Sequence, residues 1–256
     1  MTMLDKVVNS LEYLRLEASI SITNDLFKEG KLNNKNIDLL FQILNEQVKI
    51  KENNSKLYNV KVAGFPFIKS LEEFEFEFQP SLNKEQILNL SESNFFEGGT
   101  NIVFIGTPGV GKTHLSIGIG IKVAMRRNAV YFIKFNKLVN KLVNAQKEGK
   151  LEYQLKLFNK YRLLIIDEVG FNEVSKFESK LFFQLVDSRY ERRSTIYTSN
   201  LTFDKWTGIF DNDDMITRAI LDRIIHHSYL FNITGNSYRL KYKIIQDDIN
   251  DKSGDI

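Results

Sequence analysis

The residues with the clearest chemical potential form the stretch GTPGVGKT at 106–113, which follows the spacing GxxxxGK[ST]. Its glycines let the backbone turn tightly, so that consecutive N–H groups and the start of a following helix point at phosphate oxygens. The Lys112 ammonium would neutralise the β- and γ-phosphates, and the Thr113 hydroxyl would ligate Mg²⁺. The sequence thus predicts an ATP and Mg²⁺ site made by Gly106, Thr107, Pro108, Gly109, Val110, Gly111, Lys112 and Thr113.

Two carboxylates, Asp167 and Glu168, end the apolar stretch RLLIIDEVG. Ligands of open α/β sheets bind beyond the carboxyl ends of the strands, where these residues would stand beside the phosphate loop. Asp167 would hold the magnesium ion through its water shell and help to bind the nucleotide, and Glu168 would be the general base toward an attacking water. The two motifs together predict a nucleotide hydrolase.

Asn200 follows the apolar stretch STIYTS, one strand and one helix further along the chain. It would emerge at the same sheet edge and orient the attacking water near the γ-phosphate, the role known as sensor 1. A small-molecule kinase would also carry a phosphate loop, but it needs a lid and an acceptor pocket, which the sequence does not suggest. That alternative predicts phosphate transfer to an acceptor other than water.

The elements that must position these residues are short apolar runs separated by segments of helical length. The runs are rich in Ile, Val, Leu, Phe and Tyr, and they occupy residues 101–106, 129–135, 162–167, 194–199 and 229–233. Near-continuous apolar strands that alternate with helices are typical of a parallel sheet covered on both faces. We therefore predict an α/β fold with the phosphate loop directly after its first strand.

The residues before the first strand have a different pattern. Apolar residues recur at helical spacing through the first sixty residues, which predicts a helical N-terminal domain at 1–63. The family resemblance described below implies DNA or partner binding for this domain. We expect a linker and an N-terminal extension of the core at 64–100, in which FEFEF at 74–78 has the alternation of an edge strand or extended segment. The nucleotide-binding core is expected at 101–241, and a flexible, polar tail at 242–256.

The composition is that of a globular protein able to bury a sizeable core, with 43% hydrophobic and 26% charged residues. The chain has no cysteine, which excludes disulfides and thiolate metal sites and fits a reducing compartment. Its first residues lack a signal-peptide pattern, and no apolar run reaches the roughly 18 residues of a membrane span. We expect a cytoplasmic protein without a membrane partner.

Several stretches together resemble the IstB-type helper proteins of insertion-sequence transposition, within the DnaC/IstB clade of AAA+ ATPases. These stretches are LEYLRLE, FPFIKSLEEFEFEFQPSL, NIVFIGTPGVGKTHL, LLIIDEVGF, LFFQLVDSRYERRSTIYTSN, FDKWTGIF, and AILDRIIHH followed by ITGNSYRLK. They cover nearly the whole chain from Leu11 to Lys241. The phosphate loop alone would be generic, whereas the later stretches are characteristic of the clade.

This resemblance implies the P-loop AAA+ (ASCE) fold with strand order 5-1-4-3-2. It also implies a homo-oligomeric ring or spiral around double-stranded DNA, with ATP held between neighbouring subunits. Arg223 matches the family's arginine finger, which reaches the γ-phosphate bound by the next subunit, and Asp222 beside it would hold the guanidinium. Arg239 matches a second family arginine that senses the bound nucleotide. The alternative for Arg223 is a salt bridge on a helix surface.

Lysines after the second strand are the candidate DNA contacts. The corresponding region faces the central channel in similar ATPases, and lysines there would bind phosphate without reading bases. The alternative is a solvated helix face. The residues concerned are Lys134, Lys137, Lys141, Lys147 and Lys150.

Two other polar clusters are assigned to structure. His226 and His227 are expected to point to different faces of a helix end, where they would satisfy its carbonyls rather than ligate one metal. Charges at the end of a helix explain the arginines of SRYERR, which are Arg189, Arg192 and Arg193.

The sequence as a whole predicts an ATP hydrolase that oligomerises on double-stranded DNA in its ATP state and regulates a transposase. The alternative is a DnaC-like loader of a replicative helicase, with a preference for single-stranded DNA and an N-terminal domain that grips the helicase. The genetic neighbourhood, beside a transposase gene or among replication genes, would discriminate the two.

Overall fold

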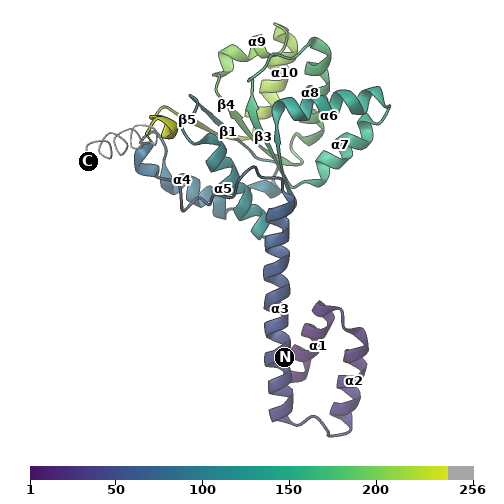
Figure 1. The fold of residues 1–256 in the computed structure, drawn as a ribbon. Helices are drawn as coiled ribbons and strands as arrows, with labels where there is room; N and C mark the ends of the chain where they lie inside the picture. The colour runs from purple at the N-terminus through teal and green to yellow at the C-terminus, as the bar shows by residue number, and fades with distance from the viewer. Residues whose placement is uncertain (242–256) are drawn as a thin grey trace, which may run out of the picture. The chain divides into compact units, whose positions relative to one another are not determined.

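The computed structural model describes residues 1–241, so the predicted tail at 242–256 lies outside the described residues. The chain divides into two compact units, Met1–Tyr58 and Asn59–Ile256. The first unit consists of helices, and the second contains the sheet (Figure 1).

The first unit contains α1 (Met3–Leu14), α2 (Glu17–Lys28) and most of α3 (Asn34–Val62). The helical spacing predicted for this region is confirmed. Helix α1 begins in a capping box, in which the Thr2 hydroxyl accepts from the Asp5 N–H and the Asp5 carboxylate accepts from the Thr2 N–H. The small core of the unit consists of Val7, Leu11, Ile37 and Leu44.

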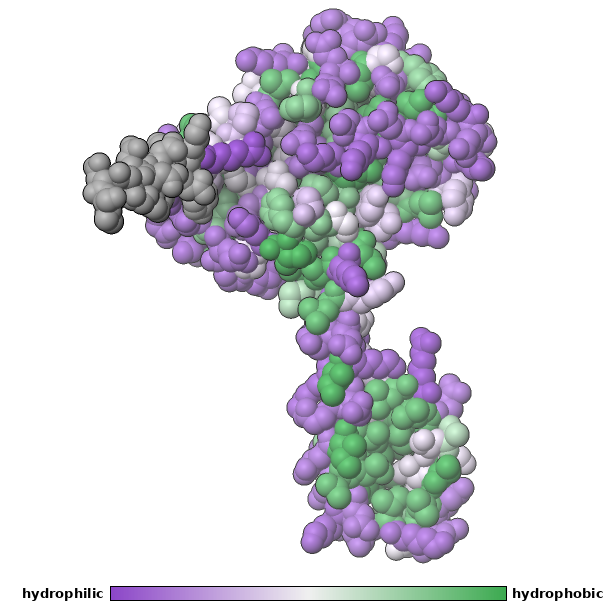
Figure 2. Space-filling view, viewed as in Figure 1, coloured by the Kyte–Doolittle hydropathy of each residue, from purple (hydrophilic) through white to green (hydrophobic). Residues whose placement is uncertain are grey.

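Hydrophobic side chains also gather on the surface of this first unit (Figure 2). On α3, the exposed residues Leu39, Ile43, Ile50 and Leu57 are each more than half accessible. A core of this size leaves part of the apolar surface of its helices uncovered.

The second unit is built on a five-stranded parallel sheet of order β2-β3-β4-β1-β5, which confirms the expected order. Its strands are β1 (Asn101–Gly106), β2 (Val130–Lys134), β3 (Leu163–Val169), β4 (Ser194–Ser199) and β5 (Ser228–Ile233). The five predicted strands are therefore present, two with the predicted ends and three with ends shifted by one or two residues. Because the strands run parallel, the carboxyl ends of β1, β3 and β4 meet at one edge.

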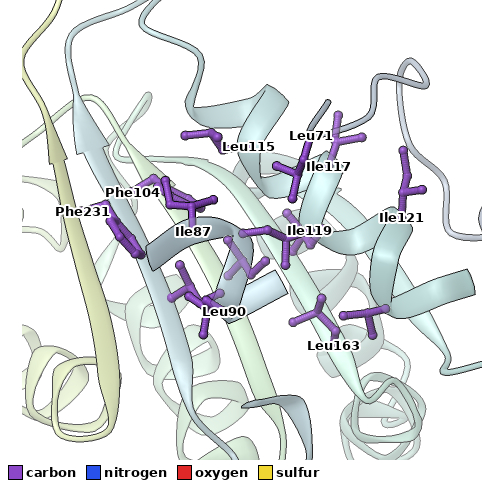
Figure 3. Packing of buried hydrophobic residues seen from close by; sticks show 14 of the residues in the cluster. Leu71, Ile87, Leu90, Phe104, Leu115, Ile117, Ile119, Ile121, Leu163 and Phe231 are labelled. Atoms are coloured by element: carbon purple, nitrogen blue, oxygen red, sulfur yellow. The ribbon is translucent and has the colours of Figure 1, made fainter. Parts of the chain in front are cut away.

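Helices cover both faces of the sheet, and a hydrophobic cluster fills the space on each side. One cluster joins α4 (Lys84–Glu92) and α5 (Lys112–Met125) to the sheet, and Figure 3 shows Ile87 and Leu90 packed near Phe104 and Phe231. The rings of Phe104 and Phe231 stack with centroids 5.3 Å apart. The second cluster belongs to α6 (Phe135–Lys147), α7 (Leu151–Lys160), α8 (Lys176–Arg189), α9 (Trp206–Ile209) and α10 (Asp214–Ile225).

The strand or extended segment expected at 74–78 is wrong. This stretch contains a 3-10 turn, η1 (Phe76–Phe78), and it belongs to none of the five paired strands. Burial still alternates, since Phe74 and Phe76 are buried and the glutamates that follow each of them are exposed. The alternation arises because the Phe74 ring packs edge-to-face on Phe76 and on Tyr238.

Arg189 lies in the last turn of α8, as the sequence predicted, but it is buried. Its side chain is 2% exposed, and its guanidinium donates to the carbonyl oxygens of Phe158 at 2.7 Å and Ser194 at 2.6 Å. Further hydrogen bonds reach the Tyr161 carbonyl and the Thr195 hydroxyl. Arg189 therefore joins the end of α7 to the start of β4 from inside the core.

Candidate nucleotide site

The phosphate loop connects β1 to α5, and two of its glycines are required by close packing. A Cβ atom on Gly106 would lie 2.3 Å from the Ile233 carbonyl oxygen, so only glycine lets the loop leave β1 alongside β5. Gly111 has φ +98°, and a Cβ there would lie 2.5 Å from the Phe74 ring. The glycines expected to cradle phosphate thus also fit the loop between its neighbours.

Lys112 is 7% exposed, and its ammonium turns back over the loop. Its Nζ donates to the carbonyl oxygens of Gly106 at 2.6 Å and Thr107 at 2.8 Å. Burial lowers the pKa of Lys112 to about 8, although the Asp167 charge acts in the opposite direction. A cation held by neutral carbonyls in a buried site is suited to exchange them for phosphate oxygens.

The two predicted carboxylates lie at the end of β3, where the pairing with β4 shifts register between Ile166 and Val169. Asp167 is 1% exposed, and its Oδ1 accepts from the hydroxyls of Thr113 at 2.9 Å and Thr198 at 2.6 Å. Burial raises the pKa of Asp167, and the two hydroxyl hydrogen bonds lower it. The irregular pairing lets this strand end present Asp167 to the phosphate loop.

Thr198 is the functional residue that sequence reasoning missed. Besides donating to Asp167, its hydroxyl accepts from the Glu168 N–H at 2.9 Å. Glu168 has a φ of +62°, a left-handed conformation that is costly outside glycine. Thr198 therefore fixes both carboxylate-bearing residues, and only the register of β3 on β4 reveals this.

The Glu168 carboxylate forms an ion pair with Lys134, whose Nζ lies 2.8 Å from Oε2. Lys134 ends β2, the strand that pairs directly with β3. Of the five lysines considered for DNA, the structure places this one in the nucleotide pocket.

These groups line a cavity of about 520 Å³, within the size range of small-molecule sites. Asn200 lies on its wall with Lys112, Thr113, Asp167 and Glu168, which brings the predicted residues of three strand ends together. The segment before the core contributes more of the wall than the sequence indicated. The other lining residues are Pro66, Phe67, Lys69, Glu73, Glu75, Pro108, Gly109, Gly111, His114, Lys134, Phe171, Thr198, Tyr238 and Arg239.

Arg239 reaches the cavity because the chain after β5 is attached to the phosphate loop. The Tyr238 N–H donates to the Gly109 carbonyl at 2.9 Å, and Lys241 forms an ion pair with Glu75. A Cβ on Gly109 would lie 3.6 Å from the Arg239 side chain. Lys112 and Arg239 both line the cavity, and the charge of Arg239 adds to burial in lowering the pKa of Lys112.

Arg223 lies outside the cavity of its own chain. On α10 its Nε donates to Asp187 at 2.7 Å, and the guanidinium carbon lies 4.7 Å from the centre of the Phe183 ring. The expectation that Asp222 holds this guanidinium is wrong, because the ion-pair partner is Asp187 on the facing helix α8. Arg223 is half-buried and held in one orientation by groups of its own chain.

The remaining four candidate DNA lysines are exposed on α6 or in the turn that follows it. Lys141 donates to the Tyr131 hydroxyl and Lys150 pairs with Glu148. No helix within residues 1–241 combines the length and apolar character needed to cross a membrane.

Residues 9–245 match the protein family described as IstB-like ATP binding protein. The chain belongs to this family. The IstB-like assignment agrees with a site in which the phosphate loop, the β3 carboxylates and Asn200 share one cavity. It also confirms the resemblance noted from the sequence.

Three relatives of this IstB-like protein cover between 72% and 92% of its length. It is 43% identical over 238 residues to the insertion sequence IS232 ATP-binding protein of Bacillus thuringiensis subsp. berliner, covering 92% of this chain and 94% of that protein. The IS5376 ATP-binding protein of Geobacillus stearothermophilus is 39% identical, with 82% and 84% covered. The IS21 ATP-binding protein of Pseudomonas aeruginosa is 42% identical, with 72% and 69% covered.

Solved structures similar to this IstB-like chain share its fold. The DnaC helicase loader has a TM-score of 0.51 at 24% identity, covering 59% of this chain and 87% of that one. AMPPCP-bound DnaA from Aquifex aeolicus has a TM-score of 0.55 at 23% identity, covering 71% and 55%. The second unit is therefore a P-loop AAA+ fold of the DnaC and DnaA kind.

Proposed function

We propose that this protein hydrolyses ATP. The observation that carries the proposal is the convergence of Lys112, Asp167, Glu168 and Asn200 on one cavity at the carboxyl edge of the sheet. The loop amides and Lys112 would bind the phosphates, which replace the loop carbonyls as partners of the ammonium. A γ-phosphate bound there would lie beside a carboxylate and an amide that can both act on water.

In the proposed reaction, a water oxygen attacks the γ-phosphorus while the bond from that phosphorus to the β,γ-bridging oxygen breaks. Glu168 accepts the water proton, and Asn200 orients the water by hydrogen bonding. The products are ADP and inorganic phosphate. Lys134 pairs with Oε2 of Glu168, and this ion pair stabilises the carboxylate against accepting a proton.

The donor set beside the phosphate loop fits Mg²⁺. Asp167 and Thr113 offer hard oxygen ligands that lie within hydrogen-bonding distance of each other, and magnesium prefers such ligands. When bound, the ion would neutralise phosphate charge. Thr113 would contact it directly and Asp167 through water.

We assign Arg223 to the ATP site of a neighbouring subunit in a homo-oligomeric ring or spiral. It lies outside its own cavity, yet Asp187 and Phe183 hold its guanidinium in a defined place. An arginine supplied by a neighbour stabilises negative charge in the transition state, and is worth about 10³–10⁵ in rate where it has been measured. Hydrolysis would then depend on assembly. Arg239, attached to the phosphate loop of its own chain, would respond to nucleotide in cis.

For the DNA partner, the exposed lysines on and after α6 support phosphate contacts with double-stranded DNA. Such contacts are insensitive to sequence and weaken as salt rises.

The transposase partner is supported by relatives whose names tie them to insertion sequences. We assign its binding to the first unit, whose α3 exposes apolar side chains on the surface. A DnaC-like helicase loader remains the second candidate on the strength of the shared fold.

The test is ATP turnover with and without double-stranded DNA, for the wild type, Glu168→Gln and Arg223→Ala. We expect DNA to stimulate the wild type and both variants to lose turnover while retaining ATP binding. Absence of both DNA stimulation and DNA-dependent assembly would refute the DNA-regulated hypothesis. Strand-transfer assays with a transposase, set against helicase-loading assays, separate the two candidate partners.

Mixing two inactive variants tests whether Arg223 acts in trans. Lys112→Ala subunits offer Arg223 but cannot bind ATP, and Arg223→Ala subunits bind ATP without offering the finger. Random assembly of equal amounts in a head-to-tail ring would restore roughly a quarter of the wild-type sites. The matched control is the double variant, which should give no recovery with either single variant.

A further inference from the structure

A second cluster of metal-ligating side chains lies where α8 leads into β4 and α10 into β5. It consists of Glu191, His226 and His227, and one ligand atom from each lies within 4.8 Å of the others. The expectation that the two histidines point to different faces is wrong, because their ring centroids are 4.1 Å apart. His226 is the C-cap of α10, and both rings face Glu191.

The backbone on both sides of this cluster is held in place. Glu191 has φ +56°, a left-handed conformation, and a Cβ on Gly99 would lie 2.6 Å from the Glu191 carbonyl carbon. On the opposite side, the Asn101 N–H donates to the His227 carbonyl at 2.7 Å, which anchors the histidine pair to the start of β1. The fold therefore positions the carboxylate and the two rings before any ligand arrives.

The distances within the cluster suit a small tetrahedral cation. Zinc lies about 2.0–2.2 Å from nitrogen and oxygen ligands, which places adjacent ligand atoms of a tetrahedron roughly 3.3–3.6 Å apart. Glu191 Oε1 is 3.3 Å from His227 Nε2 and 3.9 Å from His226 Nδ1. Small side-chain rotations would bring all three ligands to coordination distance.

Tyr190 contacts one histidine of the cluster. Its hydroxyl lies 2.7 Å from His226 Nδ1. Nδ1 is also the atom that faces Glu191 at 3.9 Å, so a metal bound at Nδ1 would replace the tyrosine hydroxyl as its partner.

We propose that His226, His227 and Glu191 form a binding site for a divalent transition-metal ion of the zinc class. Two imidazoles and a carboxylate favour zinc over magnesium or calcium, which prefer all-oxygen sites. The three side chains are exposed, so the fourth position is open to solvent. A bound ion would join the ends of α8 and α10, the two helices that carry Asp187 and Arg223. The inference does not depend on ATP hydrolysis or DNA binding.

The experiment is calorimetric titration of the full chain, without a histidine tag, with Zn²⁺ in excess Mg²⁺, which occupies hard-oxygen sites. We expect one Zn²⁺ per chain, and more than about tenfold weaker binding for Glu191→Gln and for His227→Gln. The charge-matched control is Glu97→Gln, an exposed position outside the cluster, which should bind as the wild type does.

Visible absorption of the Co²⁺-loaded protein gives a second readout. Tetrahedral coordination with imidazole ligands gives intense bands, which should disappear in His227→Gln while its thermal unfolding without metal stays at the wild-type temperature. Absence of saturable Zn²⁺ binding would overturn the proposal. Binding that survives unchanged in both the Glu191→Gln and His227→Gln variants would overturn it equally.

Discussion

The ion pair between Lys134 and Glu168 makes a quantitative prediction about basal turnover. The two side chains are 43% and 33% exposed, so the pair belongs with surface ion pairs, which contribute about 0.2–1 kcal/mol. If Glu168 has to leave Lys134 before it accepts a proton, this free energy is part of the activation barrier. Replacing Lys134 by Met should therefore raise kcat without DNA by up to about fivefold.

The assay is phosphate release at saturating ATP, since the loss of a cation from the cavity should also raise KM for ATP. Lys156→Met is the matched control. It removes an ion pair with Glu152 at 2.6 Å on α7, outside the cavity, and should leave kcat unchanged. A kcat for Lys134→Met equal to or below that of the wild type would refute the reasoning, because the lysine would then assist the reaction.

Three further predictions concern single groups. The charged form of Lys112 in the nucleotide-free protein is lost as pH rises through about 8, so ATP affinity should be constant below that pH and fall above it. Above this pH, calorimetry in buffers of different ionisation enthalpy should detect proton uptake when ATP binds. Thr198→Val removes the hydrogen bond to the buried Asp167 carboxylate, and such a bond is worth about 1.5–3 kcal/mol. Turnover should therefore fall by roughly tenfold or more while ATP binding is retained, and turnover equal to that of the wild type would contradict this. Arg189→Met leaves buried carbonyls without their donor, so the free energy of unfolding measured by urea denaturation should fall by about 3 kcal/mol or more. A decrease below about 1 kcal/mol would show that water replaces the guanidinium.

Much of the nucleotide site was predictable because its signals are local in the sequence. The phosphate loop and the carboxylates of β3 each occupy a few consecutive residues, and parallel strands bring their ends to one edge. Thr198 was not predictable in the same way, since its partners are chosen by the register of β4 on β3. The same limit applies to Asp187, which lies on a different helix from Arg223.

The incorrect predictions share a physical cause. The alternation of FEFEF indicated which side chains are buried, but burial against an aromatic cluster produces the same pattern as a strand. The burial of Arg189 was not foreseen because arginine is rarely buried, and only the carbonyls converging on it explain the exception. The histidine pair was judged by regular helical spacing, whereas the rings of His226 and His227 both turn toward Glu191.

The hydrogen bond from Tyr238 to Gly109 has a consequence for how the protein is made. During synthesis the phosphate loop leaves the ribosome long before β5 and the residues after it, yet those late residues form one wall of the nucleotide cavity. A nascent chain that ends before Tyr238 would carry the complete GTPGVGKT motif without its partner at Gly109 and without Arg239. The ATP site would thus be completed only when synthesis has passed Arg239, after every strand of the sheet has been made.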